Sequence, residues 1–223
     1  MKKTGLLLFF MALLLVWGCG QKADEGQKDS NETMAQEVPK DDTLATKTFE
    51  IRNEDDPFVT IQTKYGDMIL ELYRDVAPAH ADSFVARTND GFYNGLLFFR
   101  IINNFMIQGG DPNNNGSGNA GYFLNAEFND LPHQDGTLSM ARAQAPNSAS
   151  SQFFICLARN RQTQFLDGKY TVFGQLIKGY DVLHKIGAVE VEANPNNPRE
   201  ISKPLEEIAM DKVFLSDADG NPL

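Results

Sequence analysis

One permanently charged side chain, Arg100, stands within a largely apolar segment, residues 99–107. An arginine cannot lose its charge, so this placement is costly unless the guanidinium has a partner or a task. Gln108 follows directly, and Gln152 precedes a second apolar run at residues 153–155. An arginine and two glutamines do not supply acid–base or nucleophilic chemistry. They favour an apolar pocket with a few hydrogen-bonding groups at its rim.

Five short motifs include both segments. They are Phe-Arg-Ile-Ile at 99–102, Gln-Gly-Gly-Asp at 108–111, Leu-Ser-Met-Ala at 138–141, Ser-Gln-Phe-Phe-Ile at 151–155 and Leu-Asp-Gly-Lys at 166–169. In this order and spacing they resemble the cyclophilins, a family of peptidyl-prolyl cis-trans isomerases, and the resemblance extends from about Phe58 to Phe214. It implies a mainly β fold, a closed antiparallel β-barrel capped by two α-helices, and isomerase activity.

The resemblance also implies roles for individual residues. Arg100 would donate a hydrogen bond to the reacting amide, Gln108 would bond the substrate backbone, and Phe105 would join them in the catalytic group and form part of the slot for the proline ring. The remaining residues implied to contact substrate are Met106, Ala141, Arg142, Gln152, Phe154, Phe165, Leu166 and Tyr170.

Three of these residues depart from the family's pattern. Phe165 stands where many cyclophilins have a tryptophan whose indole N–H helps to hold cyclosporin, so we expect weak cyclosporin binding with turnover retained. Tyr170 replaces a histidine at the pocket edge, where an aromatic ring with a polar tip can still close the slot. Arg142 stands where many members have asparagine, which would alter the groove for residues ahead of the proline.

Rotation about an X–Pro bond needs no bond to be made or broken. Its barrier of ~18–20 kcal/mol reflects lost amide resonance, so a catalyst must bind the twisted amide better than either planar form. The twisted proline nitrogen regains a lone pair, and a fixed cationic donor in a low-dielectric cleft can bond it. We therefore expect neither cofactor nor metal.

Two apparent ligand motifs fail on their context. Residues 116–121 spell G-x-G-x-x-G but follow a turn cluster and precede no helical pattern, which a dinucleotide site requires. The same segment begins like a calcium loop at Asp111, yet Tyr122 occupies the position that needs a bidentate glutamate. We expect an exposed loop beside the pocket. The three histidines, at positions 80, 133 and 184, lack ligand spacing and are expected to be surface or satisfied residues.

Short strands and two helices must position these side chains. Residues 58–63 and 68–73 predict a hairpin, and further strands are expected at 96–102, 105–108, 136–141, 152–157, 172–176 and 208–215. Helices are expected at 78–87 and 180–186. Many short strands with two helices favour a β-barrel capped by helices.

The chain begins with features of a bacterial lipoprotein. An apolar run at 6–17 is too short to span a membrane and ends in Val-Trp-Gly-Cys at 16–19, which resembles a lipobox. The sequence thus predicts a signal peptide at 1–18, lipidation of Cys19, a disordered polar tether at 19–48 and an isomerase domain at 49–223. The tether's r.m.s. span of roughly 30 Å would hold the domain clear of a bilayer. We expect an extracytoplasmic, membrane-anchored protein.

Charge and cysteine content limit the partners. The formal charge is −10, and loss of Lys2 and Lys3 with the signal peptide makes it −12, which argues against nucleic acid and against electrostatic docking on anionic lipid. Lipidation of Cys19 would leave Cys156 without an intramolecular disulfide partner, as a buried inert thiol. A monomer is the default expectation.

Three functions remain open. The leading hypothesis is a lipid-anchored isomerase that acts on proline-containing polypeptides and assists the folding of exported proteins. The alternative is a proline-binding chaperone or interaction module with little turnover, which would not need Arg100 as a donor. The third is an interaction lipoprotein in which the fold serves only as a scaffold.

Overall fold

The computed structural model of the chain describes residues 47–223. Its first half contains β1 (Phe58–Thr63), β2 (Gly66–Leu72), α2 (Pro78–Asn89), β3 (Arg100–Ile102), β4 (Met106–Gly109) and β5 (Thr137–Met140). The second half contains β6 (Phe153–Cys156), α3 (Arg161–Gln164), β7 (Val172–Lys178), α4 (Tyr180–Gly187), β8 (Val191–Asn194), β9 (Asn197–Pro204) and β10 (Lys212–Ser216). Both expected helices and all the expected strands are present, but the strands expected at 96–102 and 208–215 begin only at Arg100 and Lys212.

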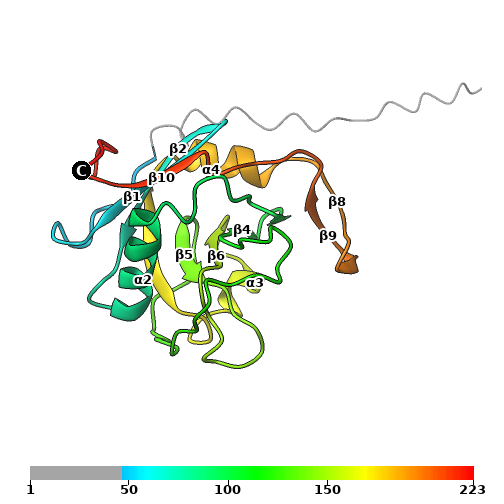
Figure 1. The fold of residues 1–223 in the computed structure, drawn as a ribbon, viewed down its shortest axis with the longest axis horizontal. Coiled ribbons are helices and arrows are strands. Elements are labelled where there is room, and N and C mark those ends of the chain that lie inside the picture. Colours follow the sequence, from blue (N-terminus) through cyan, green and yellow to red (C-terminus); the bar gives the residue numbers. More distant parts are fainter. Residues whose placement is uncertain (1–46) are drawn as a thin grey trace, which may run out of the picture. The chain divides into compact units, whose positions relative to one another are not determined.

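Eight strands form one curled antiparallel sheet in the order β10-β1-β2-β7-β5-β6-β4-β3 (Figure 1). The sequence predicted a closed barrel, but the ladder is open between the edge strands β3 and β10, so the sheet is a half-barrel. The expected strand at 96–102 pairs as a strand only from Arg100 onward. Before that point, the chain makes a single bridge, Leu97 to Ala209, and the Leu97 N–H donates to the Asn114 side chain.

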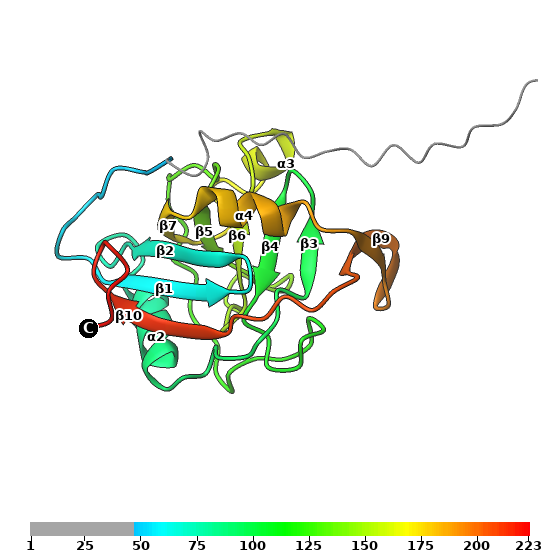
Figure 2. The ribbon, with the colours of Figure 1, turned by 90° about the horizontal axis from the view of Figure 1, so that it is seen from above.

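Alternation along the strands divides the side chains between two faces of the half-barrel. In β6, Phe153 and Ile155 enter the main core, whereas Phe154 and Cys156 belong to a second, smaller apolar cluster. Helices α2 and α4 lie on opposite sides of the curled sheet (Figure 2). Phe84 of α2 anchors the main core through an edge contact with Phe153, with ring centroids 5.2 Å apart.

A separate two-stranded hairpin, β8–β9, projects beside the main sheet (Figures 1 and 2). It follows α4, and β9 packs against β3, the edge strand that carries Arg100. No strands were expected from the sequence at these positions. Its register is irregular, with shifts at Glu192/Ala193 and Ala193/Asn194.

The predictions for the chain's beginning fall outside the described residues. These are the signal peptide at 1–18, lipidation of Cys19 and most of the tether at 19–48. Lys47, at the end of the predicted tether, pairs with Asp135, and its ammonium lies 4.1 Å from the ring centroid of Tyr180. In the part of the chain that is described, no helix has the length and apolar character needed to cross a bilayer.

Candidate active site

The candidate site lies on the face of β3, β4 and β6 that points away from the main core. Register pairs Arg100 with Gln108, and Gln108 with Phe154, so these three side chains stand in one row across the sheet. Ile101, Ile107 and Ile155 point the other way, into the core. Period-two alternation in three neighbouring strands therefore gathers the charged and amide groups predicted from the sequence.

Beside this row is a cavity of about 350 Å³ with an apolar floor. Met106, Phe154 and Leu166 are buried there, and Tyr170 meets Phe154 edge-on with ring centroids 5.9 Å apart. The predicted residues that line the cavity are Arg100, Phe105, Met106, Gln108, Ala141, Arg142, Phe154, Leu166 and Tyr170. A flat, apolar ring of proline size fits such a slot.

Arg100 is held at the rim by two elements. Its Nε and Nη2 donate to the two carboxylate oxygens of Glu200, at 2.7 and 2.8 Å, and its Nη1 donates to Gln108 Oε1 at 2.9 Å. The Gln108 amide in turn donates to Gln152 Oε1 at 3.0 Å, and Gln152 donates to the carbonyl of Gly118 at 2.8 Å. A continuous row of hydrogen bonds thus connects the hairpin, the sheet and the loop beside the pocket.

Glu200 comes from β9 and is an acid held in its charged form. The bonds from Arg100 lower the pKa of its carboxyl to about 2, and Ser202 Oγ adds a bond to Oε1 at 2.7 Å. Ser202 is fully buried and accepts from Asn194 of β8 at 3.2 Å. The carboxylate is therefore itself fixed within the hairpin.

The loop at 111–118 borders the cavity, as the sequence analysis expected. Asp111 is fully buried, and its carboxylate accepts the backbone N–H groups of Asn113, Asn115 and Gly116 at 2.9, 3.1 and 2.5 Å. Asp111, which begins the calcium-like pattern, therefore uses both carboxylate oxygens to accept backbone N–H groups of its own loop. Gly110 precedes it at a φ of +79°, where a Cβ would collide with the carbonyl oxygen of Ser151.

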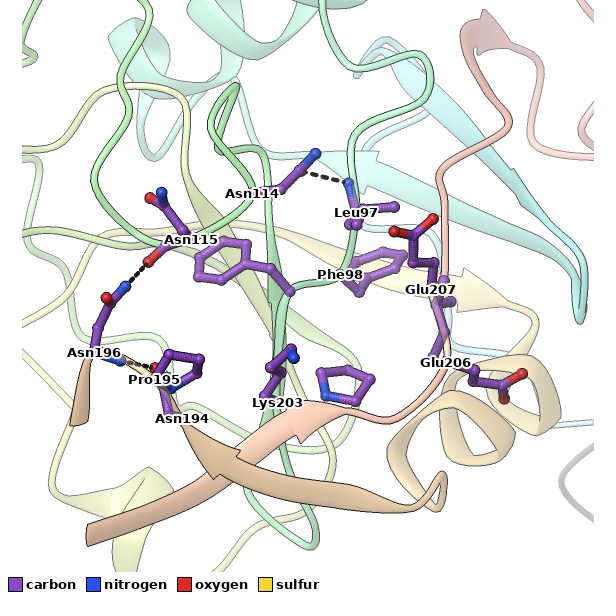
Figure 3. Close-up of a pocket in the computed structure, with 13 residues that line it drawn as sticks. Leu97, Phe98, Asn114, Asn115, Asn194, Pro195, Asn196, Lys203, Glu206 and Glu207 are labelled. Atoms are coloured by element: carbon purple, nitrogen blue, oxygen red, sulfur yellow. Dashed lines mark hydrogen bonds between the residues drawn. The ribbon is translucent and has the colours of Figure 1, made fainter. Parts of the chain in front are cut away.

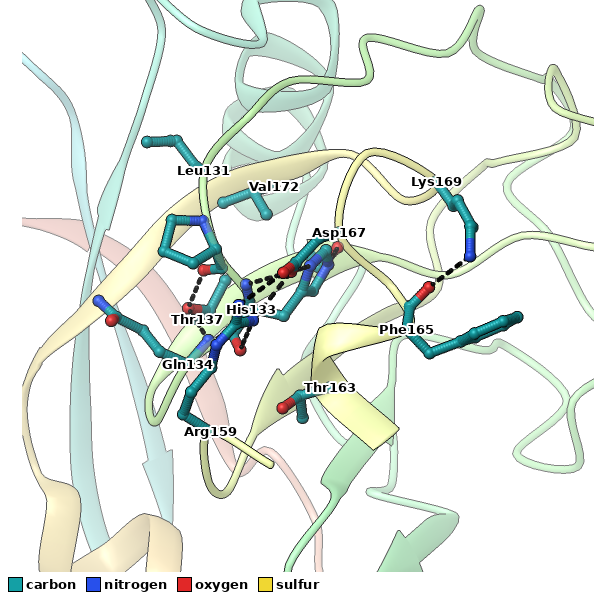
Figure 4. Close-up of polar contacts among 12 residues, drawn as sticks. Leu131, His133, Gln134, Thr137, Arg159, Thr163, Phe165, Asp167, Lys169 and Val172 are labelled. Carbon is teal, nitrogen blue, oxygen red and sulfur yellow. Dashed lines mark hydrogen bonds and ion pairs between the residues drawn. The ribbon is translucent and has the colours of Figure 1, made fainter. Parts of the chain in front are cut away.

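A buried polar cluster supports the floor of the slot (Figure 4). The His133 ring stacks on Phe154 at 5.9 Å and contacts Ser139 Oγ at 2.9 Å and Asp167 Oδ1 at 3.1 Å. Burial lowers the pKa of His133, whose neighbour Asp167 opposes that effect. Burial would raise the pKa of Asp167, but the Arg159 and His133 bonds outweigh it and hold that pKa at about 2.

Each of the three histidines contacts a carboxylate through one ring nitrogen, but the other nitrogen of His80, Nε2, is buried without a hydrogen-bond partner among residues 47–223. His80 is buried and contacts Glu127 at 2.6 Å, and His184 contacts Asp135 at 3.0 Å. Among residues 47–223 no three histidine, cysteine or acidic side chains gather as a metal site.

Two predicted contact residues lie outside the slot. Gln152 borders an adjoining cavity of about 340 Å³ together with Gln108, Ala141 and Arg142. Phe165 is 68% exposed, and its ring lies under Lys169 Nζ, 3.6 Å from the ammonium (Figure 4). Phe165 is therefore not one of the residues that line the cavity, and its contact with substrate stays a prediction. Phe165 ends the short helix α3, whose capping box at Asn160 fixes its direction.

Arg142 lines the slot, but its guanidinium is bonded to backbone carbonyl groups of the protein. Its guanidinium donates to the Lys169 carbonyl at 3.0 and 2.8 Å and to the Ala143 and Gln144 carbonyls at 2.9 and 3.1 Å. It also lies over the Tyr170 ring, 4.5 Å from its centroid. Arg142 and Tyr170, two of the residues at which the sequence departs from the family's pattern, form one wall together.

A further cavity, of about 400 Å³, lies between the hairpin and the segments around residues 97–99 and 114–115 (Figure 3). It shares Phe99, Asn115 and Asn194 with the proline slot. Asn196, at the hairpin turn, donates to the Asn115 carbonyl at 2.8 Å. The hairpin therefore forms a wall common to both cavities.

Sequence reasoning missed Glu200 and Asn194, because both belong to the unpredicted hairpin. A signal was present in the alternating residues 189–193, followed by an Asn- and Pro-rich turn at 194–198. Such a pattern is typical of two short strands around a turn. Nothing in that pattern indicates that the second strand would reach an arginine one hundred residues earlier in the chain.

These features define a class: a β-protein with an apolar pocket, a fixed cation at its rim and no acid–base pair inside it. The family model described as "Cyclophilin type peptidyl-prolyl cis-trans isomerase/CLD" matches residues 58–209. The chain belongs to this family, and its activity is that of a peptidyl-prolyl cis-trans isomerase.

Relatives from distant organisms agree. The peptidyl-prolyl cis-trans isomerase ppi1 of Schizosaccharomyces pombe is 38% identical over 158 residues, which cover 68% of this chain and 98% of the relative. A peptidyl-prolyl cis-trans isomerase of Acinetobacter baylyi is 43% identical over 135 residues, covering 59% and 72%. A crystal structure of a cyclophilin-type isomerase from Cryptosporidium parvum, determined in the presence of the dipeptide Ala-Pro, gives a TM-score of 0.64 at 32% identity and covers 71% of this chain and 98% of that one.

Proposed function

We propose that Arg100 is the donor that stabilises the twisted X–Pro amide and that proline-containing polypeptides bind across the slot. The observation that carries this proposal is the way the guanidinium is paired. An arginine has five N–H donors, and Glu200 and Gln108 take three of them. The other two N–H groups have no partner among residues 47–223 and are available to a ligand in the cavity that Arg100 lines.

The catalytic effect arises because the substrate offers these donors an acceptor only in the transition state. A planar amide nitrogen offers no lone pair, whereas the nitrogen of the twisted amide does. A donor held in place therefore binds the transition state in preference to either ground state. Each 1.36 kcal/mol of that preference raises the rate tenfold.

Three adjoining cavities support an extended peptide as the substrate. The slot shares Gln108, Ala141 and Arg142 with the cavity on one side. It shares Phe99, Asn115 and Asn194 with the cavity on the other side. A chain that runs across all three would place residues before and after the proline in contact with the protein.

The sequence at the start of the chain supports a location for this activity. A signal peptide at 1–18, a lipidated Cys19 and a polar tether at 19–48 would hold the isomerase outside the cytoplasm at a bacterial membrane. Its clients would then be exported proteins in the course of folding. Labelling with a radioactive fatty acid, in the wild-type chain and in Cys19→Ala, tests the anchor: the variant should lose the label.

Exchange NMR on a short X-Pro peptide tests the catalytic proposal. With the domain from about Thr48 onward, we expect rapid cis-trans exchange that Arg100→Ala slows by about 100- to 1,000-fold, the usual cost of losing one such donor. Peptide affinity should change far less. Peptide shifts on binding without faster exchange would instead support the proline-binding module. Weak cyclosporin binding stays a prediction, and an affinity similar to that of tryptophan-containing cyclophilins would contradict it.

A further inference from the structure

We propose that Glu200 is a positioning residue for the isomerisation, through its two-point contact with Arg100. The proposal rests on the assignment of Arg100 as the donor. Glu200 lies in the β8–β9 hairpin, which belongs to a sheet of its own, so it is supplied to the site from outside the half-barrel. Nothing in the reaction requires a carboxylate, since no proton is transferred.

The contact fixes the plane of the guanidinium as well as its place. Nε and Nη2 lie along one edge of the group, and each meets a different oxygen of the carboxylate, at 2.7 and 2.8 Å. Two parallel bonds of this kind define an orientation that a single bond leaves free. Gln108 restrains Nη1 from the sheet side. The two remaining N–H groups are thereby held in fixed directions.

Glu200 can impose this orientation because its own position is determined. Ser202 Oγ donates to Glu200 Oε1, and Asn194 Nδ2 donates to Ser202 Oγ across the hairpin. At the hairpin's tip, Asn196 bonds the Asn115 carbonyl of the loop beside the slot. The hairpin is thus fastened to the body at the arginine and again at the loop.

Orientation outweighs the loss of free charge in this reaction. The paired carboxylate weakens the field of Arg100, which would matter most for a full negative charge. The group to be stabilised is instead the lone pair of an uncharged nitrogen, whose hydrogen bond depends steeply on direction. An unpaired arginine also has considerable rotamer entropy to lose on ordering. A donor that is ordered before the substrate arrives avoids that cost in the transition state.

The test compares Glu200→Ala and Glu200→Gln with Glu192→Ala in the full domain. Glu192 is a carboxylate of the same hairpin that pairs with Lys203 at 2.8 Å and has no contact with Arg100, so it controls for a general effect on the hairpin. Exchange NMR over a range of peptide concentrations separates kcat from KM. We expect kcat to fall about tenfold or more in Glu200→Ala and less in Glu200→Gln, whose amide oxygen can still accept one bond. KM and the rate of the Glu192 variant should stay near wild type.

Two further measurements separate a positioning role from a structural one. The ¹⁵N spectrum of the Arg100 Nε–H should show a distinct, slowly exchanging signal that Glu200→Ala averages toward the free-arginine position. In an Arg100→Ala background, the additional Glu200→Ala change should alter the exchange rate by less than twofold. A further loss in that background would show that Glu200 acts by another route and overturn the proposal.

The outcomes also distinguish this proposal from the one on which it rests. If Arg100→Ala keeps the wild-type rate, the donor assignment fails, and the role of Glu200 fails with it. If Arg100→Ala is slow while Glu200→Ala and Glu200→Gln match wild type, only the positioning role fails. A faster Glu200→Ala enzyme would overturn the positioning role as well, because Glu200 would then hinder Arg100 in stabilising the twisted amide.

Discussion

One arginine–carboxylate pair lies at the rim of the slot and another in the cluster beneath its floor, and the two use different edges of the guanidinium. Arg100 offers Nε and Nη2 to Glu200 and has N–H groups of Nη1 and Nη2 left over. Arg159 offers both Nη atoms to Asp167, at 3.0 and 2.7 Å, and Nη1 also donates to the His133 carbonyl. The first pair leaves donors at the end of the side chain, whereas the second pair uses that end for structure.

This difference shows that an ion pair by itself does not reveal an arginine's role. Both arginine side chains are partly exposed, 27% for Arg100 and 39% for Arg159, and both partners have a pKa of about 2. What separates them is which donors remain after pairing. Arg100 has N–H groups left to bind a ligand, whereas Arg159 uses its terminal N–H groups to hold Asp167 and His133 beneath Phe154.

Replacement of each arginine by lysine should give the largest contrast. A lysine keeps the charge but cannot span both oxygens of Glu200 while it also meets Gln108 and a substrate. We expect Arg100→Lys to lower the catalysed exchange rate about 100-fold, roughly 3 kcal/mol of transition-state stabilisation. Arg159→Lys should change it less than about threefold. Exchange NMR at equal peptide concentration measures both, and equal losses would remove the distinction.

The Asp167→Asn variant should show the opposite profile. The change weakens the bonds to Arg159 and to the ring and backbone of buried His133, so we expect the free energy of unfolding to fall by about 1–3 kcal/mol. The exchange rate per folded molecule should stay within a few-fold of wild type. Urea unfolding followed by fluorescence or circular dichroism gives the first quantity. A catalytic loss comparable to that of Arg100→Lys would place this cluster in the chemistry.

As the pH falls, protonation of the buried histidines should lower stability before the Arg100–Glu200 pair is affected. Burial lowers the pKa of His133 and of His80, so the unfolded chain takes up protons below about pH 6.5 that the native state does not. The free energy of unfolding should therefore fall as the pH drops from 7 to 5, by at most ~1.4 kcal/mol per pH unit for each histidine. His133→Gln should remove part of that slope.

The ion pair between Arg100 and Glu200 should remain intact between pH 7 and 5. Glu200, with a pKa of about 2, remains ionised, and its contribution to stability is lost only as the pH falls from about 4.5 toward 2. The exchange rate of the folded fraction should stay level between pH 7 and 5. A decline that matches the loss of stability would mean that the cluster and the donor are coupled.

Removal of one hydroxyl should give the smallest effect. Ser202→Ala deletes the bond to Glu200 Oε1 and leaves both bonds to Arg100. We expect kcat to fall only two- to fivefold, because both bonds from Arg100 to Glu200 remain and the lost hydrogen bond acts on the position of the carboxylate alone. Ser216→Ala, a change of a buried serine of β10 that bonds Thr60 and lines none of the three cavities, is a matched control that should leave kcat unchanged.

Strand patterning made most of the site predictable from sequence. Alternation in residues 153–156 is enough to send Phe153 into the core and Phe154 to the slot. The cost of an arginine within an apolar segment also indicated that Arg100 needs a partner or a task, and the structure supplies the partner. The sequence could not name Glu200, because only the folded hairpin brings it to β3.

The closed barrel and the position of the Phe165 ring were not predictable from the sequence, each for a physical reason. Barrel closure depends on whether the ends of the sheet form a ladder, and here residues 95–98 and 208–210 meet only through one bridge and three backbone hydrogen bonds before β3 and β10 begin. The resemblance implied that Phe165 contacts substrate at the position of a tryptophan; the residue follows α3 directly, and its exposed ring lies beneath Lys169. Both outcomes depend on contacts between distant segments or on the direction in which a short helix ends.

The buried thiol of Cys156 should react only when the domain unfolds, so its reactivity reports unfolding. It is the one cysteine of residues 47–223, it is fully buried beside Met106 and Phe154, and burial raises its pKa well above the usual range. Thiol–disulfide exchange and alkylation both need an accessible thiolate. The folded domain should therefore pass through an oxidising compartment without forming mixed disulfides, and the rate at which a maleimide reacts should report how often the chain opens.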